Sequence, residues 1–257
     1  MSTFRIALLH VSPTLADVAA NQQLVESALR IAAGAGASWV ITPELVTTGY
    51  SFAARIGTSW IAAQPDAWVR RVAAIAAEQR IAIFLSVPER AGAELFNSML
   101  AIDRTGAIVG YHRKINTLRV GAEAWSTPGR SIRTAELDGF GSVGMLICAD
   151  ACTTAIAKAF ADQGARALVS SAAWAPGLYG PQGEWEAVSL DTGLPLFVAN
   201  RTGADTVLEF DRSESVVAFG GQRLFSQASP TNTIFLVEWD FDRNCLESHS
   251  LLAGPLA

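Results

Sequence analysis

GMLICAD, residues 144–150, is the stretch that carries the strongest structural signal in this chain. It is predicted to form a short apolar strand that ends at Cys148, before small and polar residues that can start a helix at Thr153 and Thr154. The N-terminus of a helix favours negative charge and offers unpaired backbone N–H groups. This position therefore predicts a thiol that is both exposed and ionised.

Two other segments end in the same way. WVITPE, residues 39–44, is a predicted strand that ends at Glu44, and AIVGYHRK, residues 107–114, is one that ends at Lys114. Thiols are mostly protonated at neutral pH, so a nucleophilic cysteine needs a base or a nearby cation. A carboxylate, an ammonium group and a thiol at three strand ends form a plausible base, cation and nucleophile.

Strands and helices alternate over the first two thirds of the chain. Apolar runs and turn signals predict strands at 5–10, 38–42, 81–87, 95–102, 107–113, 142–148, 167–171, 196–200, 215–219 and 233–240. Apolar residues at helical spacing predict helices at 21–34, 67–79 and 154–163. The turn DRTG, residues 103–106, predicts a hairpin. This mixture of connections indicates an α/β fold with mixed sheets covered by helices.

Composition narrows the class of protein. The chain has 257 residues, of which 50% are hydrophobic, and no linker divides it, so we expect one domain with a core at about 4–242 and a C-terminal tail at 243–257. The net charge is −5 and the basic residues are dispersed, so the sequence has no basic patch of the kind that binds nucleic acids. The longest apolar run, 81–87, is too short to span a membrane. A strand that begins almost at Met1 and three unpatterned cysteines predict a cytoplasmic protein without a signal peptide.

Three sequence motifs together resemble a known family. They are PEL with TGY (43–45 and 48–50), RKI (113–115) and ICAD (147–150). They resemble the signature segments of the nitrilase, or carbon–nitrogen hydrolase, superfamily, in the family's order. The central residues are 70 positions apart (44 to 114) and then 34 (114 to 148), which suits that fold. The resemblance extends over about residues 4–242.

The resemblance implies a more specific fold than the hydrophobic periodicity of the sequence can define. It implies a single-domain, four-layer αββα sandwich, whereas the pattern of elements alone also allows a doubly wound sheet. It further implies a homodimer or higher homo-oligomer, a small-molecule amide substrate, and neither a metal nor an organic cofactor.

The resemblance also implies a role for each motif residue. Cys148 is the nucleophile, Glu44 the general base, and Lys114 the cation that stabilises the tetrahedral intermediate, with the backbone N–H of Ala149 as a second oxyanion donor. Glu123, which precedes a Pro-Gly pair as in many relatives, is expected to position Lys114 and to hydrogen-bond the substrate amide.

Other residues keep alternatives open. His112 lies two residues from Lys114, so in a strand it shares a face with the lysine and could be the base instead. Tyr50 and Trp174 are candidates for the substrate pocket, although such aromatic residues more often belong to a core or an interface. Cys152 could pair with Cys148 in a disulfide or a metal site, but a structural thiol is the better interpretation.

Departures from the family pattern affect the choice of substrate. The nitrile-hydrolysing branch usually has Trp-Glu after its cysteine, and this chain has Ala149 and Asp150. We therefore predict an amidase that converts a linear carboxamide to an acid and ammonia. The alternatives are a nitrilase, an N-carbamoyl hydrolase that uses Arg119 or Arg201 for a substrate carboxylate, and a non-catalytic partner protein.

Overall fold

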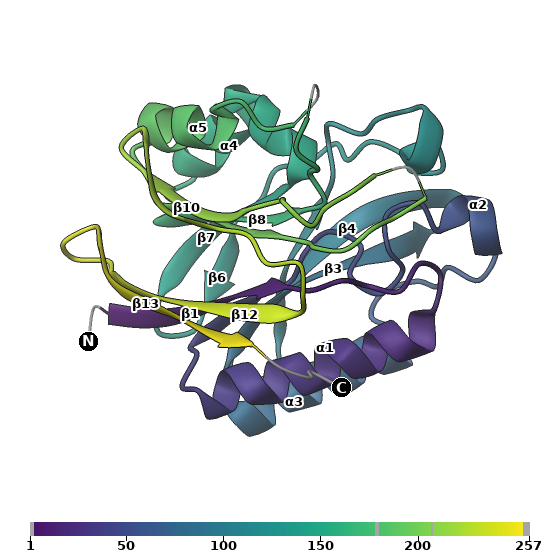
Figure 1. Ribbon diagram of the computed structural model, residues 1–257, viewed down its shortest axis with the longest axis horizontal. Helices are drawn as coiled ribbons and strands as arrows, with labels where there is room; N and C mark the ends of the chain where they lie inside the picture. Colours follow the sequence, from purple (N-terminus) through teal and green to yellow (C-terminus); the bar gives the residue numbers. More distant parts are fainter. Residues whose placement is uncertain (1–2, 178–179, 207, 254–257) are drawn as a thin grey trace.

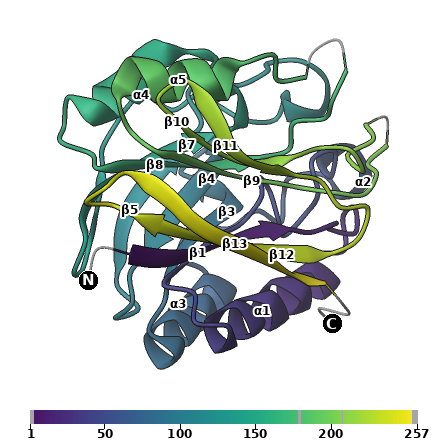
Figure 2. The same cartoon turned by 60° about the vertical axis from the view of Figure 1, so that its left-hand side comes forward.

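The chain folds into two sheets that lie face to face, with helices on both outer faces (Figure 1 and Figure 2). A computed structural model describes residues 3–177, 180–206 and 208–253. The four layers confirm the predicted αββα sandwich, and the pattern of elements is that of a single domain.

The first sheet has seven strands in the order β13-β12-β1-β2-β3-β4-β5. Its strands are β1 (Thr3–His10), β2 (Trp39–Ile41), β3 (Ala82–Ala91), β4 (Glu94–Ile102), β5 (Ile108–Arg113), β12 (Thr233–Asp240) and β13 (Cys245–Ala253). β1, β2 and β3 are parallel, whereas β3, β4 and β5 form an antiparallel meander. The carboxyl end of β5 therefore points to the same edge of the sheet as that of β2.

The second sheet has six strands in the order β11-β10-β9-β8-β7-β6. Its strands are β6 (Ala135–Leu137), β7 (Gly141–Ile147), β8 (Ala167–Ala172), β9 (Leu196–Asn200), β10 (Ser215–Phe219) and β11 (Gln222–Gln227). β7, β8 and β9 are parallel, so their carboxyl ends meet at one edge. That edge is where ligands bind in parallel sheets.

Helices cover the outer face of each sheet (Figure 1). On the first sheet lie α1 (Val18–Gly34) and α3 (Ala67–Gln79), and on the second lie α4 (Thr154–Ala161) and α5 (Glu184–Thr192). The short helix α2 (Ala53–Ile56) and two 3₁₀ turns, η1 (Gly121–Glu123) and η2 (Cys148–Cys152), lie in connections between strands. α1 and α3 begin after Asp17 and Asp66, whose carboxylates accept backbone N–H groups of the first turn.

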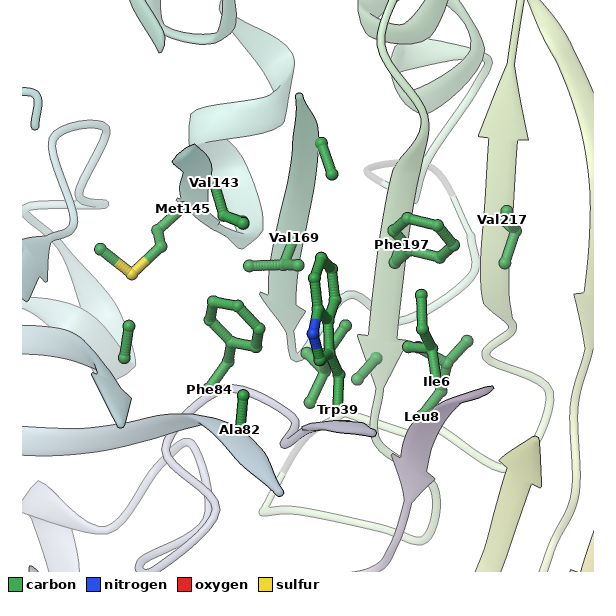
Figure 3. Close-up of a cluster of buried hydrophobic side chains, with 14 of the residues drawn as sticks. Ile6, Leu8, Trp39, Ala82, Phe84, Val143, Met145, Val169, Phe197 and Val217 are labelled. Atoms are coloured by element: carbon green, nitrogen blue, oxygen red, sulfur yellow. The ribbon is translucent and has the colours of Figure 1, made fainter. Parts of the chain in front are cut away.

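A layer of aromatic and aliphatic side chains fills the space between the sheets (Figure 3). Trp39 and Phe84 from the first sheet face Phe197, Val169 and Met145 from the second. Fully burying one such side chain stabilises the fold by roughly 1.5–3 kcal/mol. This layer fixes the two sheets relative to each other and so fixes the relative positions of the strand ends.

The prediction from the sequence did not include several elements. β6, β11, β13 and α5 were not predicted, and residues 245–253, expected to be part of a tail, form an edge strand of the first sheet. The side chains of this strand are mostly exposed, so it carries little hydrophobic periodicity. Among the described residues, none of the helices has the length and apolar character that a membrane span requires.

Candidate active site

Glu44, Lys114 and Cys148 lie just beyond the carboxyl ends of β2, β5 and β7. Backbone hydrogen bonds hold these strand ends in place. The N–H of Glu44 donates to Ala172 O at the end of β8, 3.2 Å away, which joins the two sheets at this point. The N–H of Lys114 donates to Asn97 O on β4 (2.8 Å). The topology thus brings residues from distant parts of the chain to one edge of the sandwich.

Lys114 is the centre of a buried cluster of charges. Its ammonium group lies 2.8 Å from Oε1 of Glu44 and 2.8 Å from Oε1 of Glu123. All three side chains are at most 1% exposed. Two carboxylates share one cation here, so the cluster has a net negative charge when every member is ionised.

Two further donors complete the surroundings of Glu44. Asn97 Nδ2 donates to Glu44 Oε1 (2.7 Å) and to Glu123 Oε1 (3.0 Å). The backbone N–H of Ala173 donates to Glu44 Oε2 (3.1 Å). We did not predict either residue as part of the site. A polar Asn97 within the apolar strand β4, which pairs with the strand that leads to Lys114, was the available signal.

Glu123 is held by its own short turn. The η1 turn places its carboxylate toward Lys114, and Oε2 accepts the backbone N–H of Leu118 (3.0 Å). Tyr50 lies on the same side, with its hydroxyl 3.4 Å from Glu123 Oε2. The structure thus places the Glu123 carboxylate in direct contact with the Lys114 ammonium group.

Cys148 directly follows β7 and is the first residue of the η2 turn, in a strained backbone conformation. Its φ of +46° lies in the left-handed region, which costs a non-glycine residue roughly 1–3 kcal/mol. Cys148 is only 7% exposed, and the rest of η2 separates it from α4. The expectation of an exposed thiol is therefore wrong, because Cys148 is buried at the edge of the sheet.

Electrostatics around the thiol follow from this burial. Burial raises the pKa of Cys148 well above its ordinary value, and the charge on Glu44 raises it further, although Lys114 opposes both effects. Burial also raises the pKa of Glu44, against the opposing effects of Lys114 and Asn97. Burial lowers the pKa of Lys114, but the carboxylates of Glu44 and Glu123 raise it and keep the ammonium charged. The raised pKa of Cys148 keeps the thiol protonated at neutral pH, close to a glutamate whose pKa is also raised.

His112 hydrogen-bonds Asp150 and not the Cys148 thiol. Its Nε2 lies 2.8 Å from Asp150 Oδ2, and both side chains are buried. This pair engages His112, the alternative base, and the structure places Glu44 rather than His112 in the lysine cluster.

The two arginines considered for a substrate carboxylate lie in different surroundings. Arg201 is buried and forms an ion pair with Asp205 (3.2 Å). The guanidinium of Arg201 also stacks over Phe210, 4.5 Å from the ring centre. Arg119 is exposed on the loop before η1. Asp205 in turn accepts the backbone N–H of Tyr50 (2.9 Å), so the arginine pair supports the loop that carries Tyr50.

The remaining candidates lie at the border of the site. Trp174 follows β8 and packs edge-on against Trp185, with ring centres 5.5 Å apart. Cys152 is exposed and forms no disulfide with Cys148. No group of three or more metal-ligating side chains is found among the residues the structure describes.

The comparisons assign this fold to a class of hydrolases that act on carbon–nitrogen bonds. The family model for carbon-nitrogen hydrolases matches residues 5–243. The chain belongs to the carbon–nitrogen hydrolase family, and it is an enzyme of that superfamily.

Individual relatives agree with this assignment. A probable nitrilase of Schizosaccharomyces pombe is 24% identical over 226 residues, which cover 84% of this chain and 81% of the relative. The amidase from Nesterenkonia sp. AN1, in a structure with the acetamide moiety of fluoroacetamide covalently added at the active-site cysteine, superimposes with a TM-score of 0.79 at 25% identity. This superposition covers 93% of this chain and 91% of the amidase. Nit3 of Saccharomyces cerevisiae shares the fold, with a TM-score of 0.82 at 19% identity over 93% and 90% of the two chains.

Proposed function

We propose that this enzyme hydrolyses a linear carboxamide to a carboxylic acid and ammonia through a thioester on Cys148. The observation that carries the proposal is the buried cluster in which Lys114 binds Glu44 and Glu123, beside a thiol whose pKa is raised. A protonated thiol needs a base, and a carboxylate whose pKa is also raised can accept its proton. In a Glu-to-Gln mutant of the amidase from Nesterenkonia sp. AN1, the acetamide moiety of fluoroacetamide is covalently added at the active-site cysteine, which supports a nucleophilic role for Cys148.

The first half of the reaction forms the thioester. Glu44 takes the proton from the Cys148 thiol as the sulfur attacks the carbonyl carbon, and the carbonyl oxygen becomes an oxyanion. Lys114 and the backbone N–H of Ala149 donate to this oxyanion, which is where negative charge develops in the transition state. The carbon–nitrogen bond then breaks, and the proton held by Glu44 passes to the departing nitrogen, which leaves as ammonia.

The second half releases the acid. Glu44, again ionised, takes a proton from water as the water oxygen attacks the thioester carbon. The second oxyanion is stabilised by the same two donors. The carbon–sulfur bond breaks, and the proton returns from Glu44 to the sulfur of Cys148, which restores the resting thiol.

Glu123 and Tyr50 are proposed to bind the substrate amide. Glu123 is held by Lys114, Asn97 and Leu118, so its carboxylate has a fixed direction. A fixed carboxylate is suited to accept an N–H from the amide, which favours a substrate with an unsubstituted nitrogen. Trp174, at the end of the neighbouring strand, is proposed to contact the acyl group.

A panel of substrates tests the proposal. Ammonia release is measured from small, acidic, aromatic and amino-acid amides and from matched nitriles, with the wild type and Cys148→Ala in parallel. Release from amides that disappears in the variant is the expected result. Release from nitriles alone would assign the enzyme to the nitrilase branch, and carbon dioxide release from N-carbamoyl compounds would assign it to a carbamoyl hydrolase. If neither protein releases a product from any compound, and Cys148 of the wild type is alkylated at the rate of an ordinary thiol, the result would favour a non-catalytic partner.

Two properties of the whole protein are proposed from the family resemblance. We propose a homo-oligomer, which light scattering on the purified protein tests by mass. We also propose a cytoplasmic location, which cell fractionation tests.

A further inference from the structure

The buried pair of His112 and Asp150 lies outside the lysine cluster and takes no part in the proposed chemistry. Both side chains are at most 1% exposed. Burying a charged group is costly unless it is well hydrogen-bonded. The backbone segments that this pair hydrogen-bonds therefore indicate its role.

The carboxylate of Asp150 accepts hydrogen bonds from four donors in two segments of the chain, the end of β5 with its exit and the end of β7. Its Oδ1 accepts the backbone N–H groups of Ile115 (3.0 Å) and Asn116 (2.8 Å). Its Oδ2 accepts the backbone N–H of Ile147 (3.1 Å) and His112 Nε2 (2.8 Å). An ionised carboxylate only accepts hydrogen bonds, so Nε2 of His112 is the donor in this pair. Although burial raises the pKa of Asp150, these bonds lower it overall and keep the group ionised.

The segments that Asp150 joins are those that carry the reacting groups. Ile115 and Asn116 directly follow Lys114, and Ile147 directly precedes Cys148. The side chain of Asn116 adds a bond from Nδ2 to the carbonyl oxygen of Ala149 (2.7 Å). The exit of β5 is thus tied to the turn that holds Cys148 with its left-handed φ of +46°. A strained residue persists only where its surroundings fix it firmly.

We propose that Asp150 and His112 are positioning residues that hold the Cys148 turn in register with Lys114 and Glu44. They act through the backbone and touch neither the substrate nor the thiol proton. The inference rests on the proposed function only in that Cys148 is taken as the nucleophile. Loss of the pair should therefore leave a folded protein in which the thiol no longer responds to Glu44 and Lys114.

The test combines two substitutions with a readout that needs no substrate. All variants carry Cys152→Ser, because Cys152 is exposed and shares with Cys148 the tryptic peptide between Arg133 and Lys158. Iodoacetamide labelling of that peptide is followed across pH. Asp150→Asn replaces one acceptor oxygen with an NH₂ group that would face N–H donors. His112→Gln keeps a donor near the position of Nε2, and His112→Leu removes it.

The expected result for Asp150→Asn is a cooperative unfolding transition and an alkylation profile that moves toward an ordinary thiol with a pKa of about 8.5. On an amide substrate found in the panel, kcat should fall about 100-fold while KM changes less than about threefold. His112→Leu should lower kcat about tenfold, and His112→Gln should restore it to within about threefold.

Opposite results would overturn the proposal. A folded Asp150→Asn protein with an unchanged alkylation profile would show that the pair serves stability alone. If Asp150→Asn does not fold, the two His112 variants decide. Equal kcat in His112→Leu and His112→Gln, with only the melting temperature altered, would also refute the positioning role. Failure of the amidase proposal is distinct, because it leaves the alkylation profiles as predicted while the amide panel stays silent.

Discussion

The ammonium of Lys114 donates to Glu44 Oε1 across 2.8 Å in a site where both side chains are fully shielded from water. Such a contact is strong electrostatically, yet burial penalises the charge on both partners. Glu44 responds with a raised pKa, and Lys114 remains charged because two carboxylates surround it. The same pair therefore provides a base and an oxyanion-binding cation.

Glu44→Gln should leave the fold intact and abolish turnover. The amide can replace the carboxylate in shape, and its oxygen can still accept from Lys114, but it cannot take the thiol proton. Loss of a general base typically costs about 10²–10⁴-fold in rate, to be measured as kcat/KM on an amide from the panel. Near-normal activity would mean that another group, His112 first, is the base.

The pH profile should show an acid limb set by Glu44. The raised pKa of Glu44 means that the carboxylate protonates at a higher pH than an ordinary glutamate, so kcat/KM should fall as pH drops through that raised value. Lys114 adds no alkaline limb near neutral pH, because its pKa is raised well above its ordinary value.

Asn97→Leu should move this acid limb to higher pH. Asn97 donates to Glu44 and lowers its pKa, so its removal raises the pKa further. The profile of kcat/KM is compared with that of the wild type. Ser98→Ala, on the neighbouring position of the same strand, is the matched control, because Ser98 donates to Glu89 instead. An acid limb at the wild-type position in Asn97→Leu would contradict the assignment.

Gly129→Ala should destabilise the protein and displace Lys114. A β-carbon at this position would lie 2.8 Å from the carbonyl carbon of Arg113, and the N–H of Gly129 donates to Lys114 O (2.7 Å). Overpacking of this kind typically costs about 1–3 kcal/mol. Chemical denaturation measures the loss, with Gly34→Ala as the control, since a β-carbon there meets nothing within 4 Å.

His10 should make stability depend on pH. Burial lowers its pKa from 6.5 to about 4, while Ser215 and Ser229 hydrogen-bond the neutral ring. The unfolded chain binds the proton first, so this stability is complete above the ordinary pKa and is lost as pH falls toward about 4. Between about pH 7.5 and pH 5 the loss should be about 2 kcal/mol.

His10→Gln should remove that dependence, because the amide offers a donor and an acceptor but does not titrate. The free energy of unfolding is measured at both pH values for both proteins. Equal pH dependence in the wild type and the variant would show that His10 is not its source.

Local elements were predictable where one signal dominated. The helix 67–79 was predicted with the bounds it has, since Asp66 caps a regular apolar stripe. The hairpin at 103–106 is present, with Gly106 at a φ of +83°. β13 was missed because an edge strand with mostly exposed side chains depends on its pairing with β12, which lies outside its own sequence.

By itself, the sequence determined the α/β class and placed a carboxylate, an ammonium and a thiol at three strand ends, because strand and helix periodicity and turn chemistry are local properties. Only the tertiary structure decided that Asn97 joins Glu44 to Glu123, that His112 binds Asp150, and that the thiol is buried and protonated. These depend on contacts across two sheets. Burial and distance, which set every pKa in the site, exist only once the strands have packed.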